Sequence, residues 1–327
     1  MKALRVHGYG PDDHIVLDEV PVPEPRAGEV RVRVHACGIS FVDLLLARGG
    51  YQIRPTPPFV PGSEFSGVVD AIGPDTTTDL KPGDRVAGTR QGAWAESVCV
   101  PATSIFALPA DASFVEGAVL LAAFGTALYA LRERGHLRPG ETLLVLGASG
   151  SVGHAAVQIG KLLGARVIAA ASTARKRDAA IAAGADDVVD ATGDWKDAVK
   201  TLTAPRGVDV VLDTVGGDAT DATFRTLGWG GRHLMVGFAG GTIHALKSNL
   251  ALVKGGSLIG VDFRQSGERD GSLAHDVKQD AMTMYRAGRI KPLVSHVLPL
   301  ARFEEATALV GDRAGFGRVV FTFDTGA

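Results

Sequence analysis

Short runs in which apolar and polar residues alternate dominate the first 120 residues of the chain. Residues 30–37 (VRVRVHAC) alternate strictly, which is typical of a strand with one buried and one solvated face. Two further short strand-like segments, at 67–73 and 85–88, lie between residues that favour turns. Prolines cluster in this part, most densely at 55–62. The pattern predicts a compact β-barrel domain with long connections over 1–120.

The hydrophobic pattern changes after residue 120, where apolar segments alternate with segments of helical periodicity. Continuously apolar runs are typical of strands that are buried on both faces, as in a parallel sheet. Residues 152–163 form a helical pattern that ends at Gly164, where a glycine commonly terminates a helix. Such alternation predicts an α/β domain over 121–264 with a doubly wound parallel sheet of the Rossmann type. Its strands are expected at 143–146, 166–171, 187–189, 208–213, 233–238 and 257–263.

The last part of the chain returns to a pattern of mixed elements. A helical stretch is expected at 276–288, followed by two strand-like segments, LVSHVLPL at 293–300 and GRVVFTFD at 317–324. We expect these strands to rejoin the first domain. The chain would then consist of one domain made of 1–120 and 265–327, with the α/β domain of 121–264 inserted in it.

Composition narrows the class of protein. The 327 residues are 46% hydrophobic and carry a net charge of −2, which excludes a disordered chain and gives no electrostatic reason to expect nucleic acid or an anionic membrane as partner. The longest apolar segment, 118–131, is too short to span a bilayer. Two cysteines, and a start without the apolar stretch of a signal peptide, predict a cytoplasmic location. The 42 glycines are roughly twice the usual share and indicate many tight turns or a close approach to a ligand.

A glycine-rich loop carries the clearest chemistry. The expected strand at 143–146 leads into Gly147, Gly150 and Gly153, and then into the helical segment. Small residues there allow a tight turn and let a pyrophosphate reach the backbone N–H groups at the start of a helix, and Gly153 lets that helix pack closely on the strand. This order of strand, loop, helix and second strand predicts a dinucleotide site. Its loop residues are Gly147, Ser149, Gly150, Ser151, Val152 and Gly153.

The residues after the second strand indicate which dinucleotide binds. An NAD site usually has an acidic residue there, which holds the ribose 2′-hydroxyl. This chain has AAASTARKR instead, so Ser172 and Thr173 are available to donate hydrogen bonds and Lys176 to neutralise a 2′-phosphate. NADPH is therefore predicted over NADH. The alternative is that Arg175, Lys176 and Arg177 form a solvated helix face.

Several motifs together resemble one family. The segments FVPGSEFSGVVDAIG, KPGDRVAG and GASGSVGHAAVQIGKLLGA are similar to those of the medium-chain dehydrogenase/reductase superfamily, and within it to the zinc-independent quinone oxidoreductase branch. The resemblance runs over nearly the whole chain. It implies that the first domain is a GroES-like catalytic domain and that the inserted domain binds NADPH.

The chain departs from the zinc-dependent alcohol dehydrogenases of this superfamily. Those enzymes bind zinc through the cysteine of a GxCxxD segment and the histidine and glutamate of a GHE segment. Here Ser40 and Ser63 occupy the cysteine and histidine positions, and only Glu64 remains. Serine is a poor zinc ligand, and two cysteines, Cys37 and Cys99, cannot form the structural zinc cluster. We predict that the protein binds no metal.

The resemblance also implies site residues. Ser40, Asp43 and Tyr51 match positions that line the family's substrate site and are our catalytic candidates. Tyr51 either donates a proton to an enolate or quinol oxygen or packs at a loop corner, and Asp43 acts chemically, orients a neighbour or caps a helix. The remaining cofactor-binding candidates are Thr126, Gly237 and Phe238 near the nicotinamide, Arg313 at the 2′-phosphate, and Arg318, where the family usually has lysine.

Without a metal to polarise a carbonyl, substrates that already accept hydride readily are favoured. The leading hypothesis is a zinc-independent oxidoreductase that transfers hydride from NADPH to a quinone. An enoyl or alkenal double-bond reductase is the close alternative, and a cofactor-binding protein with little turnover is an alternative of another class. The apolar segment 255–263 (GGSLIGVDF) matches an edge strand through which the family forms homodimers, and a homodimer is therefore expected.

Overall fold

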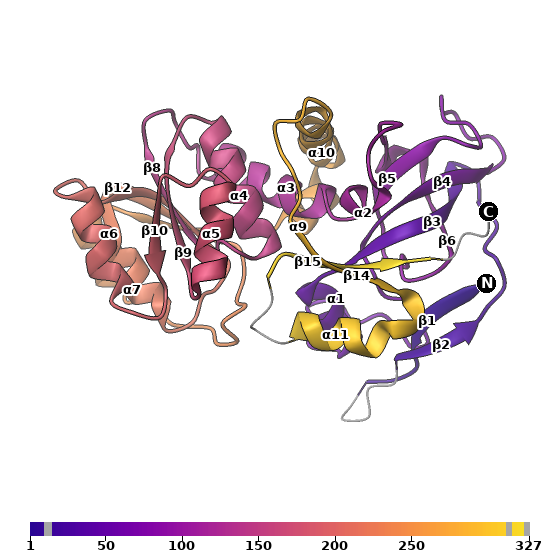
Figure 1. Cartoon of the computed structure of the whole chain (residues 1–327), viewed down its shortest axis with the longest axis horizontal. Coiled ribbons are helices and arrows are strands. Elements are labelled where there is room, and N and C mark those ends of the chain that lie inside the picture. The colour runs from indigo at the N-terminus through magenta and orange to yellow at the C-terminus, as the bar shows by residue number, and fades with distance from the viewer. Residues whose placement is uncertain (10–14, 312–315, 324–327) are drawn as a thin grey trace. The chain divides into compact units, whose positions relative to one another are not determined.

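A computed structural model of the chain describes residues 1–9, 15–311 and 316–323. The chain divides into two compact units (Figure 1). One, here called the split unit, consists of Met1–Ala122 and Met282–Ala327, and the other, the inserted unit, consists of Ala123–Ala281. The inserted unit therefore continues past residue 264, the limit that the apolar pattern predicted.

The split unit is built on a seven-stranded sheet in the order β14-β15-β3-β4-β5-β7, with β6 also paired to β3. Strand β3 (Glu29–Ile39) contains the alternating segment, and its valines at 30, 32 and 34 are all buried. It pairs antiparallel with β4 (Glu64–Ile72) and with β15 (Arg318–Thr322), so both ends of the chain contribute to one sheet. The other strands are β1 (Lys2–Val6), β2 (Ile15–Glu19), β5 (Arg85–Thr89), β6 (Ser97–Pro101), β7 (Ile105–Ala107) and β14 (Val294–Pro299).

Short helices complete the split unit. The first, α1 (Phe41–Ala47), follows directly on β3, and α2 (Phe114–Gly117) packs on β3 and β4. The others are α11 (Phe303–Gly311) and the 3₁₀ turns η1 (Ala102–Ser104) and η3 (Leu300–Arg302).

The inserted unit has a six-stranded sheet, all parallel, in the order β10-β9-β8-β11-β12-β13. Figure 1 shows α4 and α5 on one face of this sheet and α6 and α7 on the other, which is the doubly wound arrangement that the sequence predicts. The strands are β8 (Thr142–Leu146), β9 (Arg166–Ala171), β10 (Asp187–Asp190), β11 (Val208–Asp213), β12 (Leu227–Met235) and β13 (Ser257–Gly260). The helices wholly in this unit are the π-helix η2 (Tyr129–Arg134), α4 (Ser151–Leu162), α5 (Ala174–Ala182), α6 (Trp195–Thr203), α7 (Ala219–Thr226), α8 (Ser248–Lys254) and α9 (Phe263–Arg269). Two more, α3 (Leu121–Leu128) and α10 (Gly271–Arg286), run across its boundaries with the split unit.

Two strands differ from the sequence prediction at their C-terminal ends, and β12 also begins earlier than predicted, at Leu227 instead of residue 233. Strand β12 stops at Met235 because the next residues turn, with the N–H groups of Val236 and Gly237 donating to the carbonyl of Asp213. Strand β13 stops at Gly260 because Asp262 caps α9, its carboxylate accepting a hydrogen bond of 2.9 Å from the N–H of Gln265.

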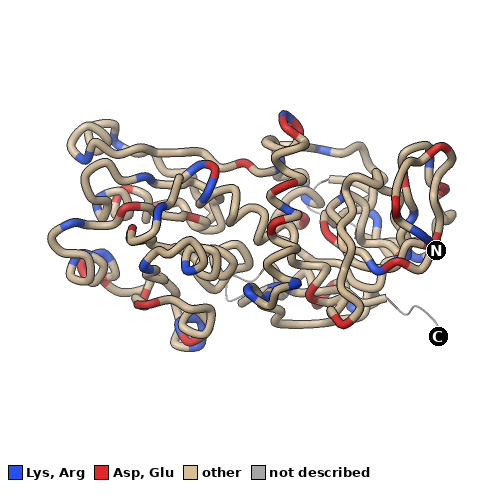
Figure 2. The backbone as a smooth tube through the Cα atoms, turned by 90° about the horizontal axis from the view of Figure 1, so that it is seen from above, with Lys and Arg blue, Asp and Glu red and all other residues tan. Residues whose placement is uncertain are grey.

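Residues of both charge signs are distributed along the chain. Figure 2 shows basic and acidic residues interspersed, in agreement with the small net charge. In the part of the chain that the structure describes, no helix combines the length and the apolar character needed to cross a membrane.

Candidate functional site

The carboxyl edge of the inserted sheet has the geometry of a nucleotide site. Strands β8 and β11 lie side by side at the centre of the sheet, and the chain leaves them toward opposite flanks of the sheet. In open parallel sheets, ligands bind outside the carboxyl ends of the strands at such a reversal of strand order. The glycine-rich loop that follows β8 lies at this point.

The backbone of the loop requires glycine at two positions. Gly147 has a φ of +67°, and a Cβ atom there would lie 2.5 Å from the hydroxyl oxygen of Thr214. At Gly153 a Cβ atom would lie 2.8 Å from the carbonyl carbon of Gly147 and nearer still to its oxygen, so helix α4 touches the loop backbone. Gly150 is the N-cap of α4 and offers no side chain, which leaves the first N–H groups of the helix without a side-chain partner. The loop is therefore shaped to receive a phosphate.

The turns after the neighbouring strands line the same edge. Asp213 is fully buried at the end of β11, and its carboxylate accepts hydrogen bonds of 2.8 Å from the N–H groups of Val215 and Gly216. Its other oxygen lies 3.0 Å from Nε2 of buried His233 on β12. This pair fixes the turn beside Thr214, which touches the glycine loop. No local sequence pattern indicates His233 as the partner of Asp213, because the two residues lie on different strands.

Gly237 and Phe238, two of the cofactor candidates, lie after β12 against this turn. The backbone N–H of Gly237 donates to the carbonyl of Asp213, and the Phe238 ring lies close to Gly216, where a Cβ atom would come within 2.7 Å of it. Phe238 is 41% exposed. The structure thus brings Gly237 and Phe238 together with the Gly147 loop at one edge of the sheet.

The residues expected at a 2′-phosphate lie at the end of β9 and the start of α5. Thr173 is the N-cap of α5, and its hydroxyl accepts from the N–H of Lys176 at 3.3 Å. Lys176 is only 9% exposed, while Ser172 is exposed. Arg177 forms an ion pair of 3.0 Å with Asp190. Lys176 is thus more buried than a solvated helix face requires, whereas Arg177, paired with exposed Asp190, and exposed Arg175 fit such a face. The contact with a 2′-phosphate stays a prediction.

The other cofactor candidates of the inserted unit fall into two places. Thr126 is half-buried within α3. Ser149 is buried in the glycine loop, and Ser151 and Val152 form the half-buried first turn of α4.

A second group of polar residues lies inside the split unit, and we call it the buried polar cluster: Ser40, Asp43, Ser63, Glu64 and Arg318. Ser40 is the N-cap of α1, and its hydroxyl both accepts from the N–H of Asp43 at 3.0 Å and donates to the Asp43 carboxylate at 2.6 Å. The same carboxylate accepts from the N–H of Ser40 at 2.8 Å and from Ser63. Asp43 is 1% exposed, and burial raises its pKa, although these hydrogen bonds act in the opposite direction.

Glu64 is the other buried acid of this cluster. Its carboxylate lies 3.0 Å from the Arg318 guanidinium and accepts from the N–H of Ala122 at 2.9 Å. Burial raises the pKa of Glu64 to about 7, while the Arg318 charge lowers it. Arg318 is buried as well, and its Nε has no hydrogen-bond partner among the described residues. This placement gives Arg318 a partner in the split unit, and its assignment to the cofactor stays a prediction.

The remaining candidates are Tyr51 and Arg313. Tyr51 lies in the loop after α1, partly exposed, and makes no hydrogen bond or ring contact within the described residues. The structure therefore joins Ser40 and Asp43 but does not bring Tyr51 into contact with them. Arg313 lies outside the described residues. Over residues 1–9, 15–311 and 316–323, no group of three or more His, Cys, Asp or Glu side chains is arranged to hold a metal ion.

Comparison with protein families agrees with the division of the chain into a split unit and an inserted unit. Residues 26–110 match the alcohol dehydrogenase GroES-like domain, and residues 151–279 match the family described as zinc-binding dehydrogenase. The chain is 37% identical over 311 residues to quinone oxidoreductase-like protein 2 of Bos taurus, covering 94% of this chain and 89% of that protein.

Two solved structures show the same fold. A mycobacterial protein, Rv1454c, determined in complex with NADPH, is 30% identical with a TM-score of 0.90, covering 98% of this chain and all of that one. The CurK enoyl reductase is 25% identical with a TM-score of 0.90, covering 99% of each chain.

Proposed function

Because the chain belongs to the medium-chain dehydrogenase/reductase superfamily and combines a GroES-like domain with a Rossmann-like parallel-sheet domain, we propose that it uses NADPH to reduce quinones without zinc. The observation that carries the proposal is the cradle formed by Gly147, Gly153 and the uncapped start of α4. In this proposal the inserted unit binds the cofactor, and the split unit supplies the groups that act on the substrate.

The choice of NADPH rests on the end of β9. No acidic side chain follows this strand directly, and the residues present are Ser172, Thr173 and Lys176. A carboxylate would repel a 2′-phosphate, whereas an ammonium group and hydroxyls attract it. The NADPH complex of Rv1454c supports the same choice for this chain.

The substrate step needs a hydride and a proton. Bound NADPH supplies the hydride, and a quinone that accepts one hydride and one proton becomes a hydroquinone. In the split unit, the Ser40 hydroxyl proton is directed to Asp43, so this pair holds a proton at a defined oxygen. Tyr51 has a phenol free to donate to a substrate oxygen, and we assign it as proton donor with Asp43 as the residue that positions Ser40.

The donor set of the buried polar cluster supports chemistry without zinc. At the two positions where the zinc enzymes have a cysteine thiolate and a histidine imidazole, this chain has the hydroxyl groups of Ser40 and Ser63. The two carboxylates are already engaged, Asp43 by the serines and Glu64 by Arg318 and a backbone N–H. A zinc ion would have to displace these contacts, and it would gain only weak serine ligands.

Reduction of a conjugated carbon–carbon double bond is the second candidate, because the fold is shared with the CurK enoyl reductase at a TM-score of 0.90. Both reactions use the same cofactor and the same hydride geometry. A protein that binds the cofactor with little turnover is the third candidate.

A substrate panel separates the three. The loss of NADPH absorbance is followed with a series of quinones and a series of conjugated enones, with NADH in parallel. We expect turnover with quinones and NADPH. Turnover only with enones would replace the first proposal by the second, and tight NADPH binding without turnover of either series would support the third.

We also propose a homodimer located in the cytoplasm. Strand β13 is the edge of the inserted sheet, and Leu258 on it is 47% exposed. An exposed apolar edge strand is a surface on which a second copy pairs. Both cysteines are free thiols, which suits a reducing compartment.

A further inference from the structure

A second pocket lies at the other edge of the inserted sheet. It is open, has a volume of about 780 Å³, and is lined by the end of α6, the segment 204–207 and the starts of β11 and β12. The glycine loop follows the carboxyl end of β8, whereas this pocket includes Asp209 at the amino end of the parallel neighbour β11. The two sites are therefore on opposite edges of one sheet.

The pocket is strongly basic. Four of its lining residues are cationic: Lys200, Arg206, Arg225 and Lys254. Its one acidic residue is Asp209, whose carboxylate accepts a hydrogen bond of 2.7 Å from the N–H of Thr142. The lining side chains alone therefore have a net charge of +3.

Three of these four cations have no carboxylate partner among the described residues. The guanidinium groups of Arg206 and Arg225 have no ion-pair or hydrogen-bond partner among the described residues. Exposed Lys200, in contrast, forms an ion pair of 3.0 Å with Asp197. Lys254 donates to the carbonyl of Leu227 at 2.6 Å. Burial lowers the pKa of Lys254, and the charges of Lys200 and Arg225 lower it further, so these cations lie close enough to repel one another.

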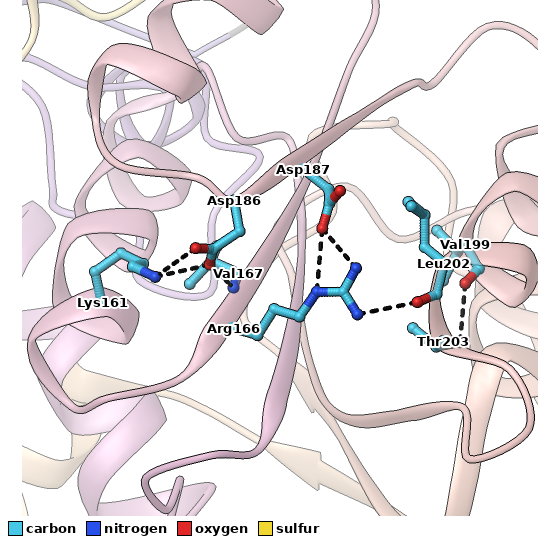
Figure 3. Close-up of polar contacts among 8 residues, drawn as sticks. All are labelled: Lys161, Arg166, Val167, Asp186, Asp187, Val199, Leu202 and Thr203. Carbon is cyan, nitrogen blue, oxygen red and sulfur yellow. Dashed lines mark hydrogen bonds and ion pairs between the residues drawn. The ribbon is translucent and has the colours of Figure 1, made fainter.

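Neighbouring cations of the same unit are paired instead. Figure 3 shows the Lys161 ammonium between both oxygens of Asp186, and the Arg166 guanidinium on Asp187 and on the carbonyl of Leu202. The contrast indicates that the unpaired charge is a property of the pocket and not of the whole edge.

An aromatic side chain completes the pocket. Trp229 at the start of β12 is 83% exposed, and its indole lies over Gly255, where a Cβ atom would come within 3.1 Å of the ring. Gly255 ends α8 with a φ of +53°. Because Gly255 has no side chain, the ring packs against its backbone while most of the Trp229 surface stays open.

We propose that this pocket binds a small phosphate-bearing anion that carries a planar ring, as a nucleotide does, at a site separate from the cofactor loop. Arg206, Arg225 and Lys254 face the phosphates, where guanidinium groups make paired hydrogen bonds. The indole of Trp229 stacks on the ring. The concave shape and the limited volume favour a small ligand over an extended chain.

The first experiment titrates pyrophosphate by calorimetry into the protein loaded with one equivalent of NADPH, so that the glycine loop is occupied and no free NADPH competes for the pocket. We expect binding that weakens with added salt. The double variant Arg206→Gln/Arg225→Gln removes two exposed charges and should weaken pyrophosphate binding at least tenfold. The control is Arg269→Gln, an exposed arginine of the same unit outside the pocket, which should leave binding unchanged. Absence of binding, or equal losses in variant and control, overturns the proposal.

The second experiment tests the ring. With one equivalent of NADPH again bound, ADP should bind several-fold more tightly than pyrophosphate, and Trp229→Leu should remove that advantage while leaving pyrophosphate unchanged. An unchanged ADP affinity in Trp229→Leu overturns the stacking contact. Light scattering on the same variants checks the other occupant, a second copy of the chain. If the wild type does not bind pyrophosphate and the double variant has a different molecular mass in solution, the pocket is a protein interface and the proposal is overturned.

Discussion

The close contact at Gly153 allows a quantitative test of the glycine loop. In the variant Gly153→Ala, the added Cβ would lie 2.8 Å from the carbonyl carbon of Gly147 and 2.9 Å from Cα of Ala148, well inside the 3.4 Å at which ordinary contacts begin. These neighbours are backbone atoms, so no side chain can rotate away. The loop and helix α4 must therefore separate by several tenths of an ångström.

Such overpacking costs about 1–3 kcal/mol. For a domain of this size, about 2 kcal/mol corresponds to a fall in the midpoint of thermal unfolding of about 4–8 °C. Separation of the loop from α4 also removes at least one charge-assisted hydrogen bond to a bound phosphate. We expect the Kd for NADPH to rise about tenfold or more.

Gly150→Ser is the matched variant in the same loop. Gly150 has an extended backbone that any residue adopts, and its Cβ would meet nothing nearer than 3.4 Å. Serine is a good N-cap, so the thermal midpoint should stay the same or rise slightly. Its hydroxyl would occupy the N–H groups that the phosphate needs, and the Kd for NADPH should again rise at least tenfold.

The two quantities are measured by scanning calorimetry and by NADPH fluorescence titration. Gly271→Ala serves as control, because a Cβ there has no neighbour within 4 Å, and it should leave the Kd unchanged without lowering the midpoint. An unchanged midpoint in Gly153→Ala would refute the contact argument. An unchanged Kd in Gly150→Ser would refute the placement of the phosphate at the start of α4.

Three further changes test other parts of the structure. Lys176→Gln should raise the Kd for NADPH at least tenfold while the Kd for NADH stays within about twofold, and equal effects would contradict a 2′-phosphate contact. Because the pKa of buried Glu64 is raised from 4.5 to about 7, the folded state binds a proton more tightly than the unfolded state, and this contribution to stability is complete below pH 4.5 and lost as the pH rises through 7. In urea unfolding, the wild type should thus lose about 3 kcal/mol of stability as the pH rises over that window. Glu64→Gln should be less stable, because Arg318 loses its partner, and its stability should depend less on pH. Equal pH dependence in the two proteins would count against the raised pKa. Leu258→Lys on edge strand β13 should halve the mass found by light scattering at micromolar concentration, and an unchanged dimer would place the interface elsewhere.

Much of the inserted unit could be predicted because its strands are continuous apolar runs. Strands β9 and β11 have the bounds that the sequence indicated, and α4 begins within one residue of its expected start. The ends of β12 and β13 could not be predicted in this way. They depend on a turn that bonds to Asp213 and on the cap supplied by Asp262, both of which leave the hydrophobic pattern unchanged.

The site was predictable to the extent that its residues are close in sequence. Gly147, Gly150 and Gly153 form a local motif, and their roles in the fold follow from spacing. The pair formed by Glu64 and Arg318 joins residues from opposite ends of the chain, and no local spacing indicates it. The buried His233–Asp213 pair likewise depends on two strands being neighbours in the sheet.

The split unit has a consequence for the order in which the protein folds during synthesis. Ile39 pairs with Val319, so the sheet that holds Ser40 and Glu64 lacks a strand until nearly the whole chain has been made. The inserted unit is continuous in sequence and can complete its parallel sheet earlier. Pairings between residues so distant in sequence form slowly, and an unpaired strand is prone to aggregation in the interval. During synthesis the inserted unit can therefore fold before the split unit is complete.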